Sequence, residues 1–240
     1  RQRTQTTIYV SVMLTRPQIP QVTASFNSIP YWIAESIKIG DTDINPLGGI
    51  NAWVVDKQSV EHGGYGSLVN LILKVRSIRD RTGVYLFRNK PLAVGSTIDL
   101  RLQNTQVTGY ITYLGTEKPV EKMVQLLVRM RARGVEPFVA ESAKVGSELK
   151  DDKGTVLAKI IDKRVSMAEV RSDVSTLGVA RVSSDLTRRD LEVTVQLLAK
   201  KKESSYYFLD TSKVKVNDWL YIPFPGEAAN APIILVEEMK

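Results

Sequence analysis

A nine-residue stretch near the start of the chain recurs once, and this repeat constrains the fold more than any other feature of the sequence. IAESIKIGD, residues 33–41, matches VAESAKVGS, residues 139–147, at a separation of 106 positions. The same separation, without a gap, gives nine identities over the 25 positions 33–57. They are Ala34/Ala140, Glu35/Glu141, Ser36/Ser142, Lys38/Lys144, Gly40/Gly146, Gly48/Gly154, Ala52/Ala158, Asp56/Asp162 and Lys57/Lys163. Self-similarity of this extent indicates that one structural unit is used twice.

The similarity extends to both sides of this segment once gaps are allowed. Apolar and polar residues alternate in the flanking segments of both copies, and a period of two predicts strands with one buried face. The aligned segments are 6–15 with 122–131, 68–77 with 191–200, and 83–102 with 205–224, which places Ile8 opposite Val124 and Tyr85 opposite Tyr207.

The repeated unit is predicted to be rich in strands. β-branched and aromatic residues fill most segments, and Pro30 and Pro137 precede the repeated AES triplet, where we expect a single helical turn. We therefore predict a mainly β protein of two tandem, duplicated small β-barrel or sandwich-like domains, residues 1–115 and 116–240. The second copy has about 16 additional residues within 164–190, rich in Ser, Asp and Arg, and these are predicted to form a surface excursion.

Charge and residue usage narrow the classes of function. The 240 residues carry a net charge of +7, no cysteine and a single histidine, His62. Disulfide frameworks, thiolate zinc sites and cysteine nucleophiles are excluded. The positive charge favours acidic partners such as nucleic acid, anionic lipid or cell-wall polymer. Because the positive residues are interleaved with 26 acidic ones, nucleic acid is not the expected partner.

Two polar loops resemble binding motifs but depart from them. GDTDINPLGG, residues 40–49, alternates oxygen ligands like a calcium loop, yet Pro46 stands where an EF-hand needs glycine and Ala52 where it needs glutamate. EHGGYGS, residues 61–67, contains His62 and is rich in glycine, but it matches neither nucleotide-binding glycine motif. We expect a solvated turn and a flexible loop, respectively.

The charged residues of the repeat itself are Glu35 with Lys38 and Glu141 with Lys144. At a spacing of three residues on one helical turn, such pairs are common surface ion pairs. No histidine or cysteine lies near either pair to act as nucleophile or base. We predict no enzymatic activity, no catalytic residues, no metal and no cofactor.

Basic residues provide the candidate binding surface. On a strand, residues at alternate positions point the same way, so three alternating arginines would form a positive ridge about 13 Å long. A solvated, protective face is the simpler interpretation, and an anion-binding face is the alternative. The residues concerned are Arg129, Arg131 and Arg133, and a cluster at a predicted hairpin formed by Lys200, Lys201 and Lys202.

Several motifs together resemble a known family. They are P-x-x-A-E-S-x-K-V-G from residue 137, G-x-x-x-A-x-I-I-D-K from residue 154, and VGSTIDLRLQNTQVTGYITYLG, residues 94–115. This combination resembles the bacterial domain of unknown function 4330 family. The resemblance covers both copies and implies an extracytoplasmic protein behind an N-terminal transmembrane helix, with no activity to transfer.

A second resemblance concerns carrier and export proteins. Residues 144–160 look like the half-motif of biotinyl and lipoyl domains, and residues 92–115 look like the barrel strands of periplasmic membrane-fusion adaptors. The chain departs from both patterns, because it has no attachment lysine in a hairpin and no long heptad hairpin.

These observations favour a non-enzymatic structural or protein-interaction module of a bacterial cell envelope. We expect an extracytoplasmic location with a membrane anchor upstream of Arg1, since RQR is followed at once by a strand-like segment. A protein partner or self-assembly is the expected interaction. The alternatives are binding of an anionic polymer or nucleic acid through the basic β face, and a component similar to an export-pump adaptor.

Overall fold

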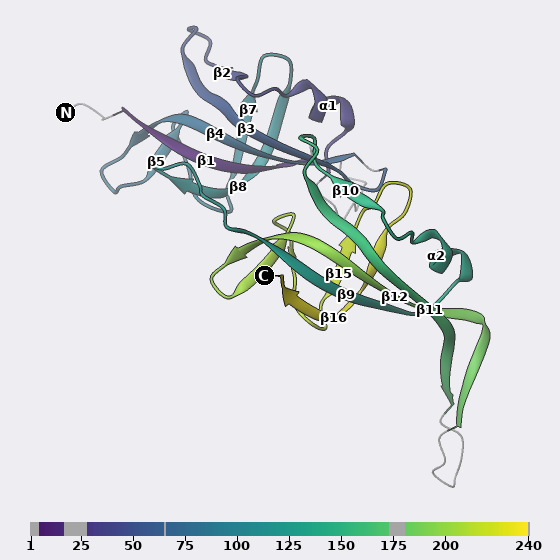
Figure 1. Ribbon diagram of the computed structural model, residues 1–240. Helices are drawn as coiled ribbons and strands as arrows, with labels where there is room; N and C mark the ends of the chain where they lie inside the picture. Colours follow the sequence, from purple (N-terminus) through teal and green to yellow (C-terminus); the bar gives the residue numbers. More distant parts are fainter. Residues whose placement is uncertain (1–4, 17–27, 65, 173–180, 240) are drawn as a thin grey trace. The chain divides into compact units, whose positions relative to one another are not determined.

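The computed structural model describes residues 5–16, 28–64, 66–172 and 181–239 (Figure 1). The chain divides into two compact units, Arg1–Val120 and Glu121–Lys240. Each unit contains one antiparallel sheet that is strongly curled into a half-barrel, and the described residues include only two short helices. This confirms the predicted class of two mainly β, barrel-like or sandwich-like domains.

Unit 1 is a sheet with the strand order β2-β3-β4-β1-β8-β7. In addition, β5 pairs with the end of β4 and with β6. Its elements are β1 (Gln5–Thr15), α1 (Tyr31–Ser36), β2 (Thr42–Ile44), β3 (Ile50–Glu61), β4 (Ser67–Arg79), β5 (Tyr85–Phe87), β6 (Lys90–Pro91), β7 (Thr97–Arg101) and β8 (Gln106–Gly115).

Unit 2 repeats this topology in the order β10-β11-β12-β9-β16-β15, with β13 pairing with β12 and β14. Its elements are β9 (Met123–Val135), α2 (Pro137–Ser142), β10 (Glu148–Lys150), β11 (Val156–Ser172), β12 (Arg181–Lys202), β13 (Ser205–Phe208), β14 (Ser212–Lys213), β15 (Trp219–Ile222) and β16 (Ala229–Glu238).

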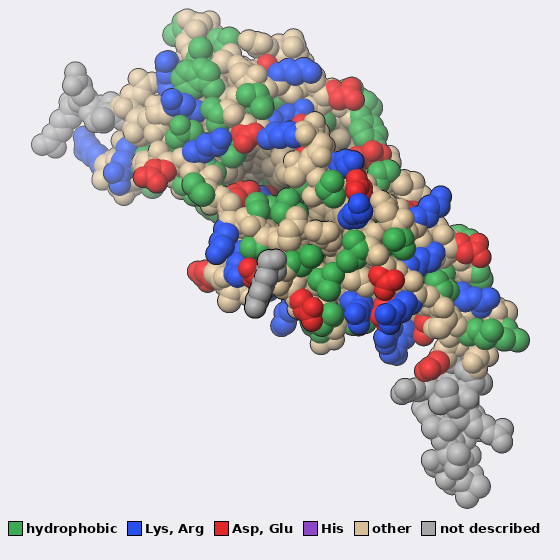
Figure 2. All heavy atoms as spheres, in the orientation of Figure 1, with side chains coloured by type: hydrophobic (Ala, Val, Ile, Leu, Met, Phe, Trp, Pro, Cys, Tyr) green, Lys and Arg blue, Asp and Glu red, His purple; other side chains and the backbone are tan. Residues whose placement is uncertain are grey.

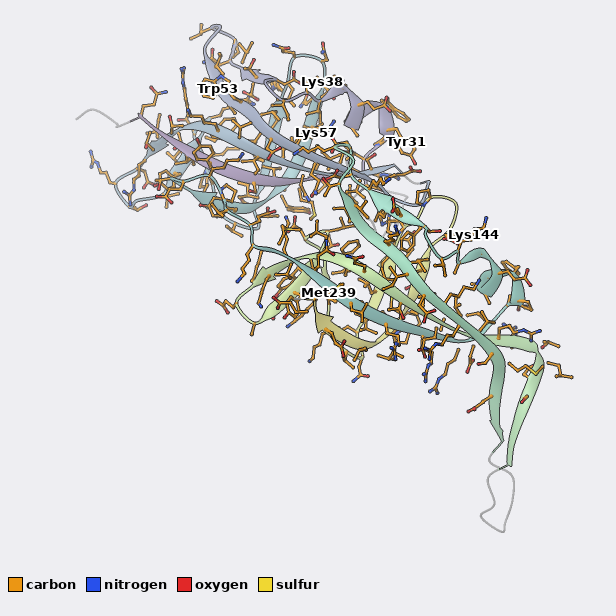
Figure 3. All side chains as sticks on the ribbon, in the orientation of Figure 1. Tyr31, Lys38, Trp53, Lys57, Lys144 and Met239 are labelled. Atoms are coloured by element: carbon orange, nitrogen blue, oxygen red, sulfur yellow. The ribbon has the colours of Figure 1, made fainter. Side chains whose placement is uncertain are left out.

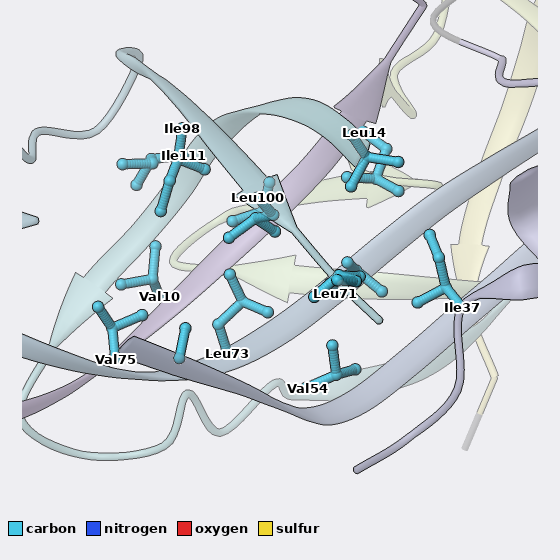
Figure 4. Close-up of a cluster of buried hydrophobic side chains, with 14 of the residues drawn as sticks. Val10, Leu14, Ile37, Val54, Leu71, Leu73, Val75, Ile98, Leu100 and Ile111 are labelled. Atoms are coloured by element: carbon cyan, nitrogen blue, oxygen red, sulfur yellow. The ribbon is translucent and has the colours of Figure 1, made fainter. Parts of the chain in front are cut away.

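The core of unit 1 fills the concave side of its sheet (Figure 4). Alternate residues of β1 are fully buried, as are alternate residues of β4, which is what period-two sequences give when one sheet face is covered. Ile37, which follows α1, caps this core beside Leu14 and Leu71. The labelled members are Val10, Leu14, Ile37, Val54, Leu71, Leu73, Val75, Ile98, Leu100 and Ile111.

Strand pairing defines which residues of the two copies are equivalent. Ala52 pairs with Val75 in unit 1, whereas Ala158 pairs with Leu197 in unit 2. The next strand places Ile8 against Val75 and Leu126 against Leu197. The expected equivalence of Ile8 with Val124 is therefore wrong by two positions.

The alignment of residues 68–77 with residues 191–200 is wrong by one position. Val69 is buried and pairs with Ser59 of β3, and the separation of 122 between Val75 and its equivalent Leu197 carries Val69 onto buried Leu191. Since a shift of one residue turns every side chain to the opposite face, the burial pattern settles the register.

The turn after β5 corrects a further equivalence. Arg88 and Asn89 have φ of 49° and 62°, and Leu209 and Asp210 have φ of 50° and 60°. Matching these consecutive left-handed pairs makes Arg88 equivalent to Leu209. Tyr85, three residues before Arg88, is then equivalent to Tyr206, and its expected equivalence with Tyr207 is wrong.

The helices are slightly longer than predicted. α1 and α2 have six residues each, more than the single turn of about 3.6 residues that was expected. Pro137 occupies the first turn of α2, where it lacks only a hydrogen bond that the helix does not need.

The additional residues of copy two form an extension of two strands. Residues 168–172 of β11 pair with residues 181–185 of β12, and this ribbon continues beyond the rest of the sheet (Figure 1). We name residues 164–172 and 181–189 the arm. The predicted surface excursion is thus a β-ribbon over its described part, and Val165 and Met167 alternate with polar residues at its start.

Candidate functional site

The repeated motif caps the C-terminal ends of the two short helices. In unit 1 Lys57 Nζ donates hydrogen bonds to the backbone oxygens of Ala34 at 2.8 Å and Ile37 at 3.1 Å (Figure 3). Ser36 Oγ donates to the backbone oxygen of Ile33 at 2.8 Å. These bonds satisfy carbonyls that a helix C-terminus leaves without partners.

The same device recurs in unit 2. Lys163 Nζ donates to the backbone oxygen of Ala143 at 2.7 Å, and Ser142 Oγ donates to that of Val139 at 2.9 Å. Gly40 and Gly146 both have φ of 95°, and their N–H groups donate at 2.8 Å to the backbone oxygens of Val54 in β3 and Ile160 in β11, respectively. The identities at these positions are explained by local structure and indicate no site.

The charged pairs of the repeat do not meet. Glu35, Lys38, Glu141 and Lys144 are all exposed, and within the described residues no ion pair joins Glu35 to Lys38 or Glu141 to Lys144. The expected surface ion pairs are therefore absent from this part of the structure.

The loop that resembles a calcium site contains a buried aspartate with protein partners. Asp43 is fully buried and accepts hydrogen bonds from Arg101 N at 2.8 Å and Asn51 Nδ2 at 2.9 Å. It also forms an ion pair with Arg88. Because Arg101 belongs to β7, this carboxylate joins the two edge strands, β2 and β7, of the curled sheet. No group of three acidic or histidine side chains in the described residues has the geometry of a metal site.

Unit 2 has no counterpart of this network. The residues equivalent to Asp43, Asn51 and Arg88 are all leucines, and the residue equivalent to Arg101 is a proline, which has no N–H to donate. In order, the four replacements are Leu149, Leu157, Leu209 and Pro223.

His62 lies in a closed turn between β3 and β4. The backbone N–H of His62 donates to the backbone oxygen of Gly66 at 2.8 Å, and the side chain of His62 is buried. Burial lowers the pKa of His62 below its usual value. Gly66 has φ of 126°, and a Cβ there would lie 2.2 Å from the backbone oxygen of Ile29. This packing accounts for a glycine at position 66 without a nucleotide ligand.

The three candidate arginines lie on the outward face of β9, as predicted from their alternation. Glu192 of β12 neutralises two of them. Arg131 donates to Glu192 from Nε at 3.0 Å and from Nη2 at 2.6 Å, and Arg129 lies 3.5 Å from the same carboxylate. Within the described residues Arg133 makes no ion pair and is exposed.

The arginines line a groove of about 650 Å³ across β9, β12 and β11. Arg164 joins them from β11, and the acidic residues Glu169, Asp190 and Glu192 line the same groove. Four positive and three negative side chains leave little net charge. Figure 2 likewise shows Lys and Arg interleaved with Asp and Glu on the visible face.

The three lysines do not form one surface. Lys200 is buried and contacts Asp210 at 2.6 Å and Glu121 at 2.7 Å. Burial lowers its pKa, but the charges and hydrogen bonds of these two carboxylates outweigh that effect and raise the pKa. Lys201 pairs with Glu238 at 2.5 Å. Of these three lysines, only the exposed Lys202 makes no ion pair in the described structure.

The arm extends beyond its counterpart in the described part of unit 1. Its base contains a bulge, since Met167 pairs with Arg189 whereas the next residue, Ala168, pairs with Asp185. Asp185 Oδ1 accepts hydrogen bonds from the N–H and hydroxyl of Thr187 at 2.8 and 2.7 Å, and these bonds lower the pKa of Asp185. The turn they form presents Leu186 outward.

Arg188 links the base of the arm to the end of β9 and the residue that follows it. Arg188 contacts Glu136 at 2.9 Å and donates to the backbone oxygen of Gly134 at 3.2 Å. Large apolar side chains are nevertheless exposed here: Val165 at 46%, Met167 at 52% and Leu186 at 71%. The sequence carried a signal for this element, because Val165 and Met167 alternate with polar residues, but the Ser and Asp content favoured a loop.

The described helices are too short to span a membrane, and the comparisons with known proteins found no match. Both described helices have six residues, far fewer than the roughly 20 needed to cross a bilayer. No family model, no curated protein and no solved structure matches this chain.

Proposed function

We propose that the protein is a non-enzymatic interaction module and that the arm of unit 2 is its binding element. The observation that supports this most is the exposure of Val165, Met167 and Leu186 on a ribbon that extends beyond its counterpart in the described part of unit 1. Several large apolar side chains exposed on one short element are typical of protein-binding surfaces. The proposed partner is a protein, a class that includes a second copy of this chain.

The backbone of the arm supports the same proposal. β10 pairs with β11 only up to Lys159, and β9 pairs with β12 only from Arg189 onward. The outer edges of residues 168–172 and 181–185 therefore have no strand neighbour among the described residues. Unpaired edges bind extended segments by strand addition, and proteins otherwise protect them.

Binding of an anionic polymer is the weaker alternative. Glu192 neutralises two of the arginines proposed for it, and Lys200 is buried. Of the six cations proposed for this surface, only Arg133 and Lys202 are exposed and make no ion pair in the described structure. An adaptor-like role gains no support from the arrangement of the strands.

An extracytoplasmic location at a bacterial envelope remains part of the proposal. It rests on the family resemblance of residues 94–115 and 137–163. Fractionation of the natural full-length protein tests it, and recovery in the cytosolic fraction would contradict it.

Site-specific photo-crosslinking tests the role of the arm. A photoreactive residue in place of Met167 should give discrete protein adducts in cells, whereas one in place of Leu47, which is 96% exposed in unit 1, should not. Val165→Ser with Leu186→Ser should remove the adducts without changing the unfolding midpoint, since both side chains are exposed. Equal adducts from the two positions would refute the proposal.

A second measurement separates the two functions. Single-stranded DNA should bind weakly, and its affinity should fall steeply from low to physiological ionic strength. Nanomolar DNA affinity at physiological ionic strength would favour the polyanion alternative.

A further inference from the structure

Unit 2 contains a small apolar cavity at the end of its half-barrel. The cavity has a volume of about 120 Å³ and is lined by residues of β9, β11, β12, α2 and β16 and of the segments that follow α2 and precede β16. The side chains that matter here are Ala132, Val139, Ala143, Leu191, Glu227 and Ala231.

The cavity exists because two core residues of unit 2 are small. Ala132 is equivalent to Leu14, and Ala143 is equivalent to Ile37. Leu14 and Ile37 are both fully buried in unit 1, where they fill this end of the core (Figure 4). Small residues that leave a void reduce stability, since the surrounding structure collapses only in part. Unit 2 therefore has an open space at a position that larger side chains fill in unit 1.

A carboxylate lies at the edge of this cavity. Glu227 Oε1 accepts a long hydrogen bond of 3.4 Å from Lys144 N, while Glu227 Oε2 is buried and has no hydrogen-bond partner in the described structure. The equivalent residue of unit 1 is Thr105. A buried carboxylate oxygen without a donor is unfavourable, so the site is complete only when a donor is supplied.

We propose that this cavity binds a small amine, in which a primary ammonium is attached to a short alkyl or aryl group. The ammonium would contact Glu227 Oε2, and the apolar group would occupy the space beside Ala132 and Ala143. The cavity, at about 120 Å³, is slightly smaller than the roughly 150 Å³ that accommodates benzene. The apolar group of the ligand is therefore limited to about the size of a benzene ring. The charge of the ligand follows from that of the carboxylate.

The arrangement favours a free amine over a lysine side chain of a protein. Glu227 is partly exposed and its neighbour Ala228 is exposed, whereas Ala143, Leu191 and Val193 are buried. The carboxylate thus lies at the rim and the apolar wall lies inside. A lysine would enter with its ammonium first and place the charge against the apolar wall, while a free amine can enter with its apolar end first. This proposal does not depend on the proposed role of the arm.

Ligand titrations followed by NMR test the proposal on the complete chain. Benzylammonium and n-butylammonium are the probes, with benzyl alcohol and benzoate as matched neutral and anionic compounds. At least one ammonium should bind saturably, with shifts confined to the cavity residues. Benzyl alcohol should bind at least about tenfold more weakly than benzylammonium, because a charged hydrogen bond is stronger than a neutral one. Benzoate should not bind.

Three variants distinguish the roles of charge and space. Glu227→Gln should weaken ammonium binding at least about tenfold and leave benzyl alcohol binding unchanged. Ala143→Ile, which copies unit 1, should abolish binding of every probe, and Ala132→Val serves if that variant does not fold. Glu141→Gln, an exposed carboxylate of α2, is the control and should bind as the parent does.

The proposal is overturned by any of three results. They are the failure of both ammonium compounds to bind, binding of benzyl alcohol as tight as that of benzylammonium, and undiminished ammonium binding by Glu227→Gln.

Discussion

The buried network around Asp43 joins the edge strands of unit 1, and unit 2 has apolar residues at the equivalent positions. This difference predicts that removing one member of the network destabilises unit 1 strongly, whereas replacing its members together does not. The reason is that a buried charge is costly only when it loses its partner, and an apolar set of similar size can replace a complete ion pair at little cost.

The magnitudes follow from the partners of each side chain. Arg88→Leu leaves a fully buried carboxylate with two neutral donors, so we expect a loss of about 3 kcal/mol, near the lower end of the range for a broken buried pair. Asp43→Leu leaves the Arg101 N–H without its acceptor, while the side chain of Arg88, at 29% exposure, can turn to water. We expect a loss of about 2 kcal/mol for that variant.

The combined variant Asp43→Leu/Asn51→Leu/Arg88→Leu/Arg101→Pro copies all four residues of unit 2. Each single change leaves a polar group without its partner, but the combination removes charges, donors and acceptor together. We expect its stability to lie within about 1 kcal/mol of the parent. The single losses should thus be strongly non-additive.

Urea unfolding in a Trp219→Phe background measures these effects. Trp32 and Trp53, both in unit 1, are then the only tryptophans, so their fluorescence follows unit 1 alone. Glu61→Gln is a control with an exposed carboxylate. A combined variant that loses as much as the single losses added together would refute the reasoning, as would a loss below about 1 kcal/mol for Arg88→Leu.

Three further predictions concern single side chains. Lys57→Met and Lys163→Met should each destabilise their own unit by about 1–2 kcal/mol, because the helix-terminal carbonyls lose a charged donor, and urea unfolding checks this. The pKa of Glu148 is lowered to about 2, chiefly by hydrogen bonds from two lysines, so its stabilising effect is present above pH 4.5 and is lost as the pH falls toward 2; a carboxyl NMR titration should show this pKa, and Lys159→Met should raise it. The pKa of His62 is lowered by burial, so its neutral form favours folding above pH 6.5 and this contribution is lost as the pH falls through the lowered pKa; the single histidine signal should titrate below 6.5.

Much of the fold could be predicted from the repeat and from periodicity. The ungapped segment contains the glycines and the lysine that end each helix, and these were visible because the local geometry accepts few other residues. The alternating segments became strands with one buried face, as in β1 and β9.

The registers could not be predicted, because bulges are invisible to a count of alternation. β3 and β11 each skip one residue in their pairing, at Val55 and Ile161, and β8 and β16 each skip one as well. A skipped residue shifts the following side chains by one position and turns them to the other face. The distribution of charge also escaped prediction, since Glu192 reaches the arginines only through strand pairing.

The positions at which the copies differ are the ones to which function can be assigned. Shared residues such as Lys57 and Lys163 maintain the fold, and their retention requires no ligand. The differing positions fall into two classes. Exchange of the Asp43 network for three leucines and a proline replaces a polar contact within the fold by apolar residues, and we assign it to the fold rather than to binding. The arm and the cavity beside Glu227 differ from this exchange. Each leaves apolar groups exposed or a charged group without a partner, which is unfavourable unless a ligand or a partner protein covers them. Both candidate sites therefore lie in unit 2, while unit 1 supplies the filled reference against which each can be tested.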